Sequence, residues 1–222
     1  MVLRINKFIA QSLSISRRKA EELISSGQIK FNDKLAVLTD RVGESDIVYY
    51  KNQIIKTPKL ETILIKLNKP LGYVCTHSAQ GGDPTIFKLL PEMFSSLKIV
   101  GRLDKDTSGL VLLTNNGDLA HRLMHPSFKK HKVYEAQLSR DLSLVEIEMI
   151  STRGVDIGEQ RESSFKLKRV VNQTYNLTLE EGRNRQIRRT FNALGIEVIK
   201  LKRLSLGEYE LGELKEGEFQ SI

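Results

Sequence analysis

The sequence predicts an α+β protein: a small helix-plus-sheet module followed by a larger, mainly antiparallel mixed sheet with packed helices. Two observations lead to this fold class. From Ile63 onward strand patterns dominate, and short turns join many of them, as is typical of antiparallel sheets. Before them, two amphipathic helical patterns open the chain. A chain of 222 residues is long enough for one large core and a smaller appended one.

The first two elements are helices. Apolar residues recur at helical spacing within residues 3–13, and a second helix follows, with Ser16 placed to cap it and Gly27 to end it in a left-handed conformation. The exposed first turn of this second helix holds Arg17, Arg18 and Lys19. Cations there oppose the helix dipole, so their presence indicates a role other than stability.

Short strands complete the first module. QIKFND (28–33) alternates apolar and polar residues before an Asn-Asp turn, and DIVYY (46–50) supplies another strand. Residues 1–58 form this module, and they carry ten Lys and Arg against six acids. The polar residues 51–62, which include Pro58, predict a linker, and residues 59–222 form the larger domain.

The larger domain contains many strands and few helices. Its strand patterns are TILIKL (62–67), KIVG (98–101), LVLLT (110–114), YEAQL (134–138), SSFKLKRV (163–170), TYNLTLEE (174–181) and IKLKRL (199–204). Its helical patterns are DLAHRLMH (118–125) and NRQIRRTFNALG (184–195). Consecutive strands with short connections favour antiparallel pairing, with the helices packed on the sheet.

The positive charge of the chain is concentrated. The net charge of +8 either attracts a polyanion or only keeps the protein soluble. Between residues 183 and 203, however, seven Lys and Arg stand against Glu197 alone, and KKHK (129–132) adds a second cluster. Clusters beside turns and helix starts favour a phosphate backbone as ligand, although many charge runs are only solvated faces.

Several common catalytic motifs are missing. The chain has no phosphate-binding GxxxxGK[ST] loop, and Ser108 lacks the GxSxG context of acyl-transfer enzymes. His121 and His125 have the spacing of metal ligands, but without the Glu of an HExxH motif they are better interpreted as helix-surface or RNA-facing groups. Cys75 stands in an apolar context typical of a buried thiol rather than a nucleophile.

The compartment follows from the same sequence. A single cysteine excludes an internal disulfide and suits a reducing environment. The N-terminus lacks the apolar core of a signal peptide, and no apolar run is long enough to span a membrane. We therefore expect a cytoplasmic protein.

One carboxylate stands out. Asp104 lies in GRLDKDTSGL (101–110), a segment rich in glycine and hydroxyl side chains between two apolar stretches. An aspartate in such a segment either stabilises a turn through backbone amides or performs chemistry. The residues alone leave both roles open.

The longer segment GRLDKDTSGLVLLTNNGDLAHRLMHP (101–126) resembles the signature of the pseudouridine synthases, in particular the RsuA/RluB type that modifies ribosomal RNA. Other parts of that pattern lie around it in the expected order: KPLGYVCT (69–76), TIFKLLP (85–91), KVY (132–134), EGRNRQIRR (181–189) and LGELKEGEF (211–219). The module at 1–58, with SRRKAEELISSGQIKFND (16–33), is similar to the RNA-binding S4 domain first described in a small-subunit ribosomal protein.

The resemblance implies the pseudouridine synthase fold and isomerisation of uridine to pseudouridine in ribosomal RNA, with no cofactor, metal or nucleotide. It implies that Asp104 is the catalytic carboxylate, acting on a flipped-out uridine either as nucleophile or as base. Arg188 matches the arginine that pairs with this carboxylate. Tyr134 matches a tyrosine that stacks on the uracil and accepts the proton from carbon 5.

The expected partner is ribosomal RNA or an assembling ribosomal subunit, bound by a monomer; no membrane partner is expected. AHRLMHPS (120–127) resembles the branch that acts on the large subunit. The predicted RNA-binding residues are Arg17, Arg18, Lys19, Lys30, Arg102, Lys129, Lys130, Arg183, Arg185 and Arg189.

Two other functions remain to be weighed. One is a catalytically inactive rRNA-binding assembly factor on the same fold, which would have no need of a buried carboxylate facing an arginine. The other is a nuclease, which would need clustered carboxylates for metal ions, whereas this segment offers only Asp104 and Asp106.

Overall fold

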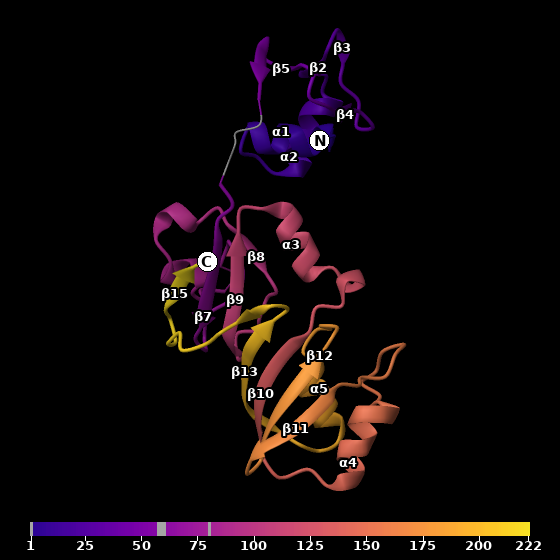
Figure 1. The fold of residues 1–222 in the computed structure, drawn as a ribbon, viewed down its shortest axis with the longest axis vertical. Helices are drawn as coiled ribbons and strands as arrows, with labels where there is room; N and C mark the ends of the chain where they lie inside the picture. Colours follow the sequence, from indigo (N-terminus) through magenta and orange to yellow (C-terminus); the bar gives the residue numbers. More distant parts are fainter. Residues whose placement is uncertain (1, 57–60, 80) are drawn as a thin grey trace. The chain divides into compact units, whose positions relative to one another are not determined.

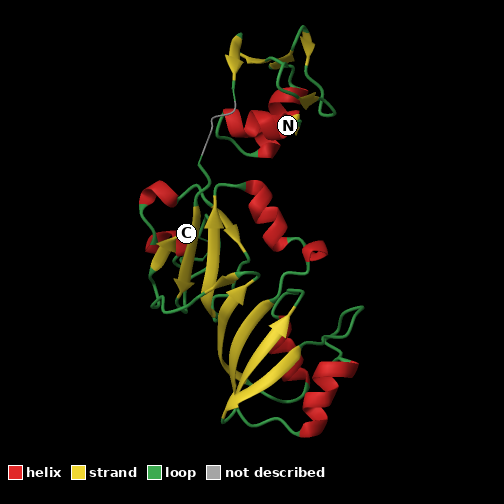
Figure 2. Cartoon of the chain, viewed as in Figure 1, coloured by secondary structure: helices red, strands yellow, loops and turns green. Residues whose placement is uncertain are grey.

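Strands outnumber helices among the described residues of the computed structural model, which confirms the α+β prediction (Figure 2). The structure describes residues 2–56, 61–79 and 81–222. The chain divides into two compact units, residues 1–61 and 62–222, each with its own hydrophobic core (Figure 1). The boundary predicted between residues 58 and 59 falls outside the described residues.

The first unit packs two helices with short antiparallel strands. Its elements are β1 (Leu3–Arg4), α1 (Ile5–Ser12), α2 (Arg17–Ser25), β2 (Ile29–Phe31), β3 (Lys34–Leu35), β4 (Arg41–Val42), β5 (Val48–Tyr50) and β6 (Gln53–Ile55). β1 pairs with β4, and the other strands form a sheet in the order β3-β2-β5-β6. The end signals of α2 are confirmed, because Ser16 Oγ accepts a bond from Lys19 N at 3.1 Å and Gly27 has φ of +69°.

The predicted linker at 51–62 is wrong in its first half. Residues Gln53–Ile55 form β6, which pairs with β5 at the edge of the sheet. The hairpin between them turns at Lys51 and Asn52, which both have positive φ, +51° and +61°. Two such residues make the mirror-image turn that matches the twist of paired strands. The predicted linker proline, Pro58, lies outside the described residues.

The second unit is built on a long mixed sheet. Its strands are β7 (Leu64–Lys69), β8 (Lys98–Val100), β9 (Ser108–Thr114), β10 (Lys132–Leu138), β11 (Lys166–Val171), β12 (Thr174–Leu179), β13 (Val198–Leu206), β14 (Tyr209–Glu210) and β15 (Phe219–Ser221). Its helices are α3 (Gly117–Met124), α4 (Leu144–Glu148) and α5 (Gln186–Ala193), with single 3₁₀ turns at Ile86–Leu89, Glu92–Phe94 and Pro126–Phe128 and a π-helical turn at Met149–Arg153. None of the described helices has the length and apolar character needed to cross a membrane.

The sheet contains one parallel junction. Its main order is β11-β12-β10-β13-β9-β7-β15, with β8 paired to β9 and β14 paired to β13. Only the β9 and β13 pair is parallel among the described strands, so the predicted mainly antiparallel sheet is confirmed. Figure 1 shows β9 and β13 side by side at the middle of this unit.

The parallel junction brings two backbones very close. Gly109 lies opposite Arg203 in register. A Cβ atom on residue 109 would lie 2.3 Å from the Arg203 carbonyl oxygen, and the φ of +103° also disfavours a side chain. The glycine of TSGL is therefore required for β9 to pack on β13.

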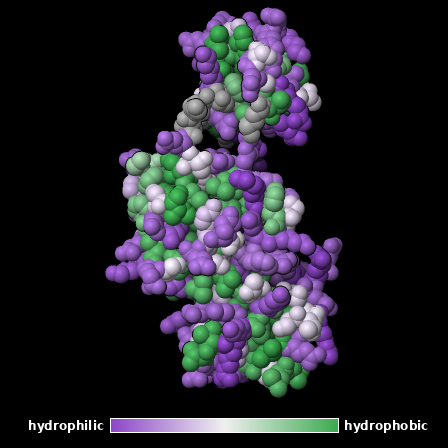
Figure 3. All heavy atoms as spheres, viewed as in Figure 1, coloured by the Kyte–Doolittle hydropathy of each residue, from purple (hydrophilic) through white to green (hydrophobic). Residues whose placement is uncertain are grey.

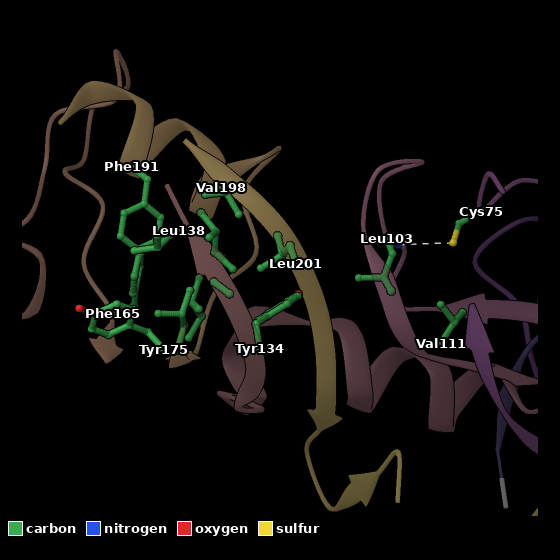
Figure 4. Packing of buried hydrophobic residues seen from close by; sticks show 14 of the residues in the cluster. Cys75, Leu103, Val111, Tyr134, Leu138, Phe165, Tyr175, Phe191, Val198 and Leu201 are labelled. Carbon is green, nitrogen blue, oxygen red and sulfur yellow. Dashed lines mark hydrogen bonds between the residues drawn. The ribbon is translucent and has the colours of Figure 1, made fainter. Parts of the chain in front are cut away.

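Two hydrophobic clusters cover the sheet. β9 is buried along its whole length, with Val111 in the larger cluster and Leu112 in the smaller one that α3 covers. In the larger cluster, Phe191 of α5 lies 5.9 Å from Phe165, ring centroid to centroid, with Leu138 beside them (Figure 4). This packing fixes α5 on the sheet. On the face that Figure 3 shows, hydrophilic side chains are spread over the whole unit with hydrophobic ones between them.

Helix α4 was not predicted from the sequence, although its start signal is present. Ser143 and Glu146 form a reciprocal capping box, the pattern S-x-x-E before a helix. Arg140 donates to both carboxylate oxygens of Glu146, at 2.7 and 3.0 Å. These bonds are the main cause that lowers the pKa of Glu146 to about 2.

Glu146→Gln should lower the melting temperature of the second unit by about 1–3 °C at pH 7, because it removes the charged pair and keeps the cap. Since folding lowers the pKa of Glu146 from 4.5 to about 2, this stabilisation is complete above the unfolded value and disappears as the pH falls toward the folded one. Melting followed by circular dichroism from pH 7 downward checks this. Glu148→Gln, at an exposed pair with Arg153 of 3.6 Å, is the matched control; a pH-independent effect of Glu146→Gln would contradict the assignment.

Candidate active site

A cavity of about 730 Å³ lies at the parallel junction of the second unit. Its walls come from the loop 101–107 before β9, from the start of α5 before β13, and from β10, which pairs with the other edge of β13. Segments far apart in the sequence therefore meet where the two halves of the sheet join. The cavity is within the ~300–1,000 Å³ range of ligand sites.

The backbone of loop 101–107 is anchored at three points. Arg203 donates a hydrogen bond to the Gly101 carbonyl. The Leu103 N–H donates to Cys75 Sγ at 3.4 Å (Figure 4). The Gly72 N–H donates to the Lys105 carbonyl at 2.9 Å. The buried thiol predicted for Cys75 is confirmed, and burial raises its pKa. Cys75 thus serves the loop as an acceptor.

Asp104 keeps its carboxylate available within this anchored loop. Its side chain is 38% exposed, and the nearest cation is Arg185, whose Nη1 lies 3.8 Å from Oδ2. Among the described residues no backbone amide donates to this carboxylate; the turn is closed instead by its carbonyl, which accepts from Thr107 N at 3.1 Å. The side chain is therefore not needed for the turn.

Asp106 is the anchored carboxylate. Arg185 binds it with both nitrogens, at 2.9 and 2.7 Å, and Arg188 Nε lies 3.1 Å from the same group. Arg188 also donates to the Asp106 carbonyl at 2.6 Å and to the Val198 carbonyl at 2.7 Å. The hydrogen bonds from Arg185 are the main cause that lowers the pKa of Asp106, so it stays ionised.

This geometry corrects the predicted partner of Asp104. We expected Arg188 to pair with Asp104, but in the structure Arg188 contacts Asp106 and Arg185 is the cation beside Asp104. The reason is local backbone geometry. Arg185 precedes α5 in a left-handed conformation, with φ of +47°, and this turns its side chain toward the loop.

Tyr134 forms another wall of the cavity. It lies on β10, is 9% exposed, and stands opposite Arg203 of β13 in register. Arg203 is 1% exposed and has Nη1 3.5 Å from the Tyr134 hydroxyl. Lys132 lines the same wall, and burial lowers its pKa, as it does for the fully buried Lys69.

Seven of the predicted site residues line this one cavity: Arg102, Asp104, Lys130, Tyr134, Arg183, Arg185 and Arg188. Arg102 is exposed there, and Lys130 pairs with Glu208 at 3.1 Å. His125 also lines it, and its ring lies 4.8 Å from that of His121. The described residues contain no cluster of three or more His, Cys, Asp or Glu that would hold a metal ion.

Two predicted RNA-binding arginines are already paired inside the unit. Arg183 contacts Glu181 at 2.8 Å and Glu159 at 3.2 Å, and Arg189 contacts Glu159. These arginines, Arg189 first, lower the pKa of Glu159. They hold the segment around Glu159 against the start of α5.

The remaining predicted contacts are exposed. Lys129 is exposed beside the cavity-lining Lys130. In the first unit, Lys30 lies on β2 and the other three cations on the first turn of α2, where Lys19 pairs with Glu22 at 2.8 Å. Arg17 and Arg18 have no ion-pair partner among the described residues.

Two site residues were missed as such by sequence analysis. Asp106 had a visible signal, because it is a second carboxylate two residues after Asp104 between the same glycines. Arg203 stood in a strand pattern where Leu201, two residues before it, is buried, so the alternation placed it on the inner face. Arg203 was counted with the basic residues of 183–203, because charge alone does not show which of them is buried.

Comparison with known proteins agrees with this architecture. The RNA pseudouridylate synthase family matches residues 63–193, and the S4 domain matches residues 3–48. A crystal structure of a pseudouridylate synthase superposes with a TM-score of 0.71 at 32% identity, covering 99% of this chain and 96% of that one.

Curated relatives extend over nearly the whole chain. An uncharacterized RNA pseudouridine synthase of Aquifex aeolicus is 34% identical, covering 99% of this chain and 92% of its own length. The ribosomal large subunit pseudouridine synthase B of Bacillus subtilis is 35% identical over 99% and 91% respectively. The protein therefore belongs to the RNA pseudouridine synthases, enzymes that isomerise uridine within RNA.

Proposed function

We propose that this chain isomerises a specific uridine of ribosomal RNA to pseudouridine, with Asp104 as the catalytic carboxylate. The observation that carries the proposal is the state of loop 101–107. Its backbone is anchored on several sides, Asp106 is bound by two arginines, and the Asp104 carboxylate is left exposed in the cavity. In such an arrangement Asp104 is the reactive group, and the residues around it hold the loop in place.

The reaction needs few groups. The bond from ribose C1′ to N1 of the uracil breaks, a bond from C1′ to C5 forms, and the hydrogen on C5 is lost as a proton while N1 gains one. The base must first leave the RNA stack so that the ribose and both ring positions are accessible. A carboxylate at the ribose, either as nucleophile or as base, serves both proposed routes.

The surroundings of Asp104 suit this role. Arg185 places a positive charge 3.8 Å from the Asp104 carboxylate and leaves that carboxylate accessible in the cavity. Arg188 contributes to the site indirectly, because it binds both the carboxylate and the backbone carbonyl of Asp106. Arg188 is thus a positioning residue for the loop that carries Asp104.

Tyr134 provides the complementary wall. Its ring lines the cavity that Asp104 also lines, where an aromatic face stacks on a flipped base. Its hydroxyl is the proposed acceptor of the C5 proton. Arg102, exposed on the same loop, is placed to hold the extruded nucleotide or to fill the gap that it leaves.

Ribosomal RNA is the proposed substrate for two reasons. One relative is the ribosomal large subunit pseudouridine synthase B of Bacillus subtilis, and this supports RNA of the large subunit as the substrate. The positive charge on the first turn of α2 supports docking of the first unit on an RNA backbone. We expect the chain to act as a cytoplasmic monomer, with Lys129, Lys130 and Arg185 as further contacts.

Asp104→Asn should abolish pseudouridine formation while RNA affinity stays within a few-fold, because one carboxylate is lost from a site that binds RNA mainly through cations. Ribosomal RNA from cells with the intact protein or the variant is mapped by carbodiimide modification and reverse-transcription stops. Asp156→Asn, at an exposed loop position outside the cavity lining, is the control. Retained turnover would refute the role of Asp104, and no stop in either strain would favour the inactive assembly factor.

Asp106→Asn should lower the single-turnover rate constant about 10–100-fold, since a loosened loop misplaces Asp104. The neutral amide loses the paired bonds of 2.9 and 2.7 Å to Arg185. The measurement is pseudouridine formed against time with enzyme in excess over RNA. Asp83→Asn is the control, because it breaks an exposed ion pair with Lys105 of the same loop, 2.7 Å long. Equal losses in both variants would contradict a special role for the Asp106 anchor.

Replacing Arg17, Arg18 and Lys19 together with Ala should weaken RNA binding and flatten its salt dependence. The logarithmic slope should fall by about 0.7–0.9 for each phosphate group that the variant no longer neutralises. Affinities measured by fluorescence anisotropy across a salt series check this. A triple variant of the exposed Lys34, Arg41 and Lys51 removes the same charge from the same unit. If both triple variants flatten the slope equally, the first turn of α2 is not the docking site.

A further inference from the structure

Arg203 is a fully buried arginine without a carboxylate partner. The residue is 1% exposed, and no carboxylate of the described residues lies within ion-pair distance of its side chain. Other cations lie close enough to feel its charge, because Arg203 is one of the causes that lower the pKa of Lys69 and of Lys132. Burying a cation without an opposite charge costs free energy, which its hydrogen bonds must offset.

The contacts of Arg203 join three elements. Nε donates to the Leu110 carbonyl of β9 at 2.7 Å, Nη2 donates to the Gly101 carbonyl, and Nη1 lies 3.5 Å from the Tyr134 hydroxyl of β10. The guanidinium carbon is also 6.0 Å from the centre of the Tyr134 ring. The side chain therefore bridges from the loop of Asp104 to the wall that holds Tyr134.

The topology explains why this residue makes the bridge. β13 lies between β10 and β9, and Arg203 stands opposite Tyr134 on one side and opposite Gly109 on the other. A planar guanidinium with several N–H groups in a fixed fork can address both sides at once. An ammonium on a flexible chain cannot reproduce that geometry.

We infer that Arg203 is a positioning residue that holds the Tyr134 hydroxyl and the Gly101 carbonyl together, and so sets the place of Tyr134 relative to Asp104. The inference rests on the proposed function and deepens it. The 3.5 Å contact is long for a hydrogen bond, and contacts of this kind shorten when substrate fills a site. A purely structural role would involve only the two backbone carbonyls, without Tyr134.

A double-mutant cycle separates the two roles. Single-turnover rate constants at saturating RNA are measured on the full chain for the wild type, Arg203→Lys, Tyr134→Phe and the double variant. We expect Arg203→Lys to lower the rate constant at least about tenfold in the wild type and less than about threefold beside Tyr134→Phe, as for side chains in contact. The dissociation constant for RNA should change less than about threefold. Arg153→Lys, at an exposed pair with Glu148, is the matched control.

A second measurement reports the contact without turnover. The six tyrosines are labelled as 3-fluorotyrosine, and Tyr134→Phe identifies the resonance of residue 134. Arg203→Lys should shift that resonance, and Arg153→Lys should not. Where circular dichroism shows that Arg203→Lys does not fold, Arg203→Gln, which keeps an N–H donor group, takes its place in both measurements.

The outcomes distinguish this inference from the proposed function. Equal fold losses in the two backgrounds, or an unmoved resonance, would overturn the positioning role and leave the isomerisation intact. A wild type that forms no pseudouridine in ribosomal RNA would overturn the proposed function and this role with it.

Discussion

The close backbone contact between Gly109 and Arg203 is the constraint on which the second unit depends. It allows β13 to run parallel to β9 and so joins the two halves of the sheet. Because the loop that carries Asp104 leads directly into β9, the same contact fixes where that loop begins. One short segment therefore serves both the fold and the site. Gly109 allows β13 to approach β9, and residues of loop 101–107 just before it line the cavity.

The two aspartates of loop 101–107 have different partners, and only Asp104 lines the cavity. Asp106 is bound by Arg185 and Arg188, while Asp104 has a partly exposed carboxylate with Arg185 3.8 Å away. Ionised groups held by fixed partners need little reorganisation during a reaction. The division also explains why several arginines gather at the start of α5, since some of them hold the protein itself together.

The two units carry different parts of the proposed function. The first unit places cations on the exposed first turn of α2, where they oppose the helix dipole. The second unit holds its cations in and around a cavity, several of them in ion pairs. Exposed cations such as Arg17 and Arg18 suit a phosphate backbone, whereas arginines held in ion pairs suit precise placement of side chains.

The sequence by itself determined the fold class, most strands, the caps of α2 and the family, because apolar periodicity, capping residues and the GRLD and QIRR motifs are local signals. It could not determine which arginine faces which carboxylate. Arg188 was expected beside Asp104, but a left-handed turn at Arg185 places that residue there instead. Nor could it separate the buried Arg203 from its exposed basic neighbours. Such pairings depend on how distant strands meet, and only the tertiary structure decides them.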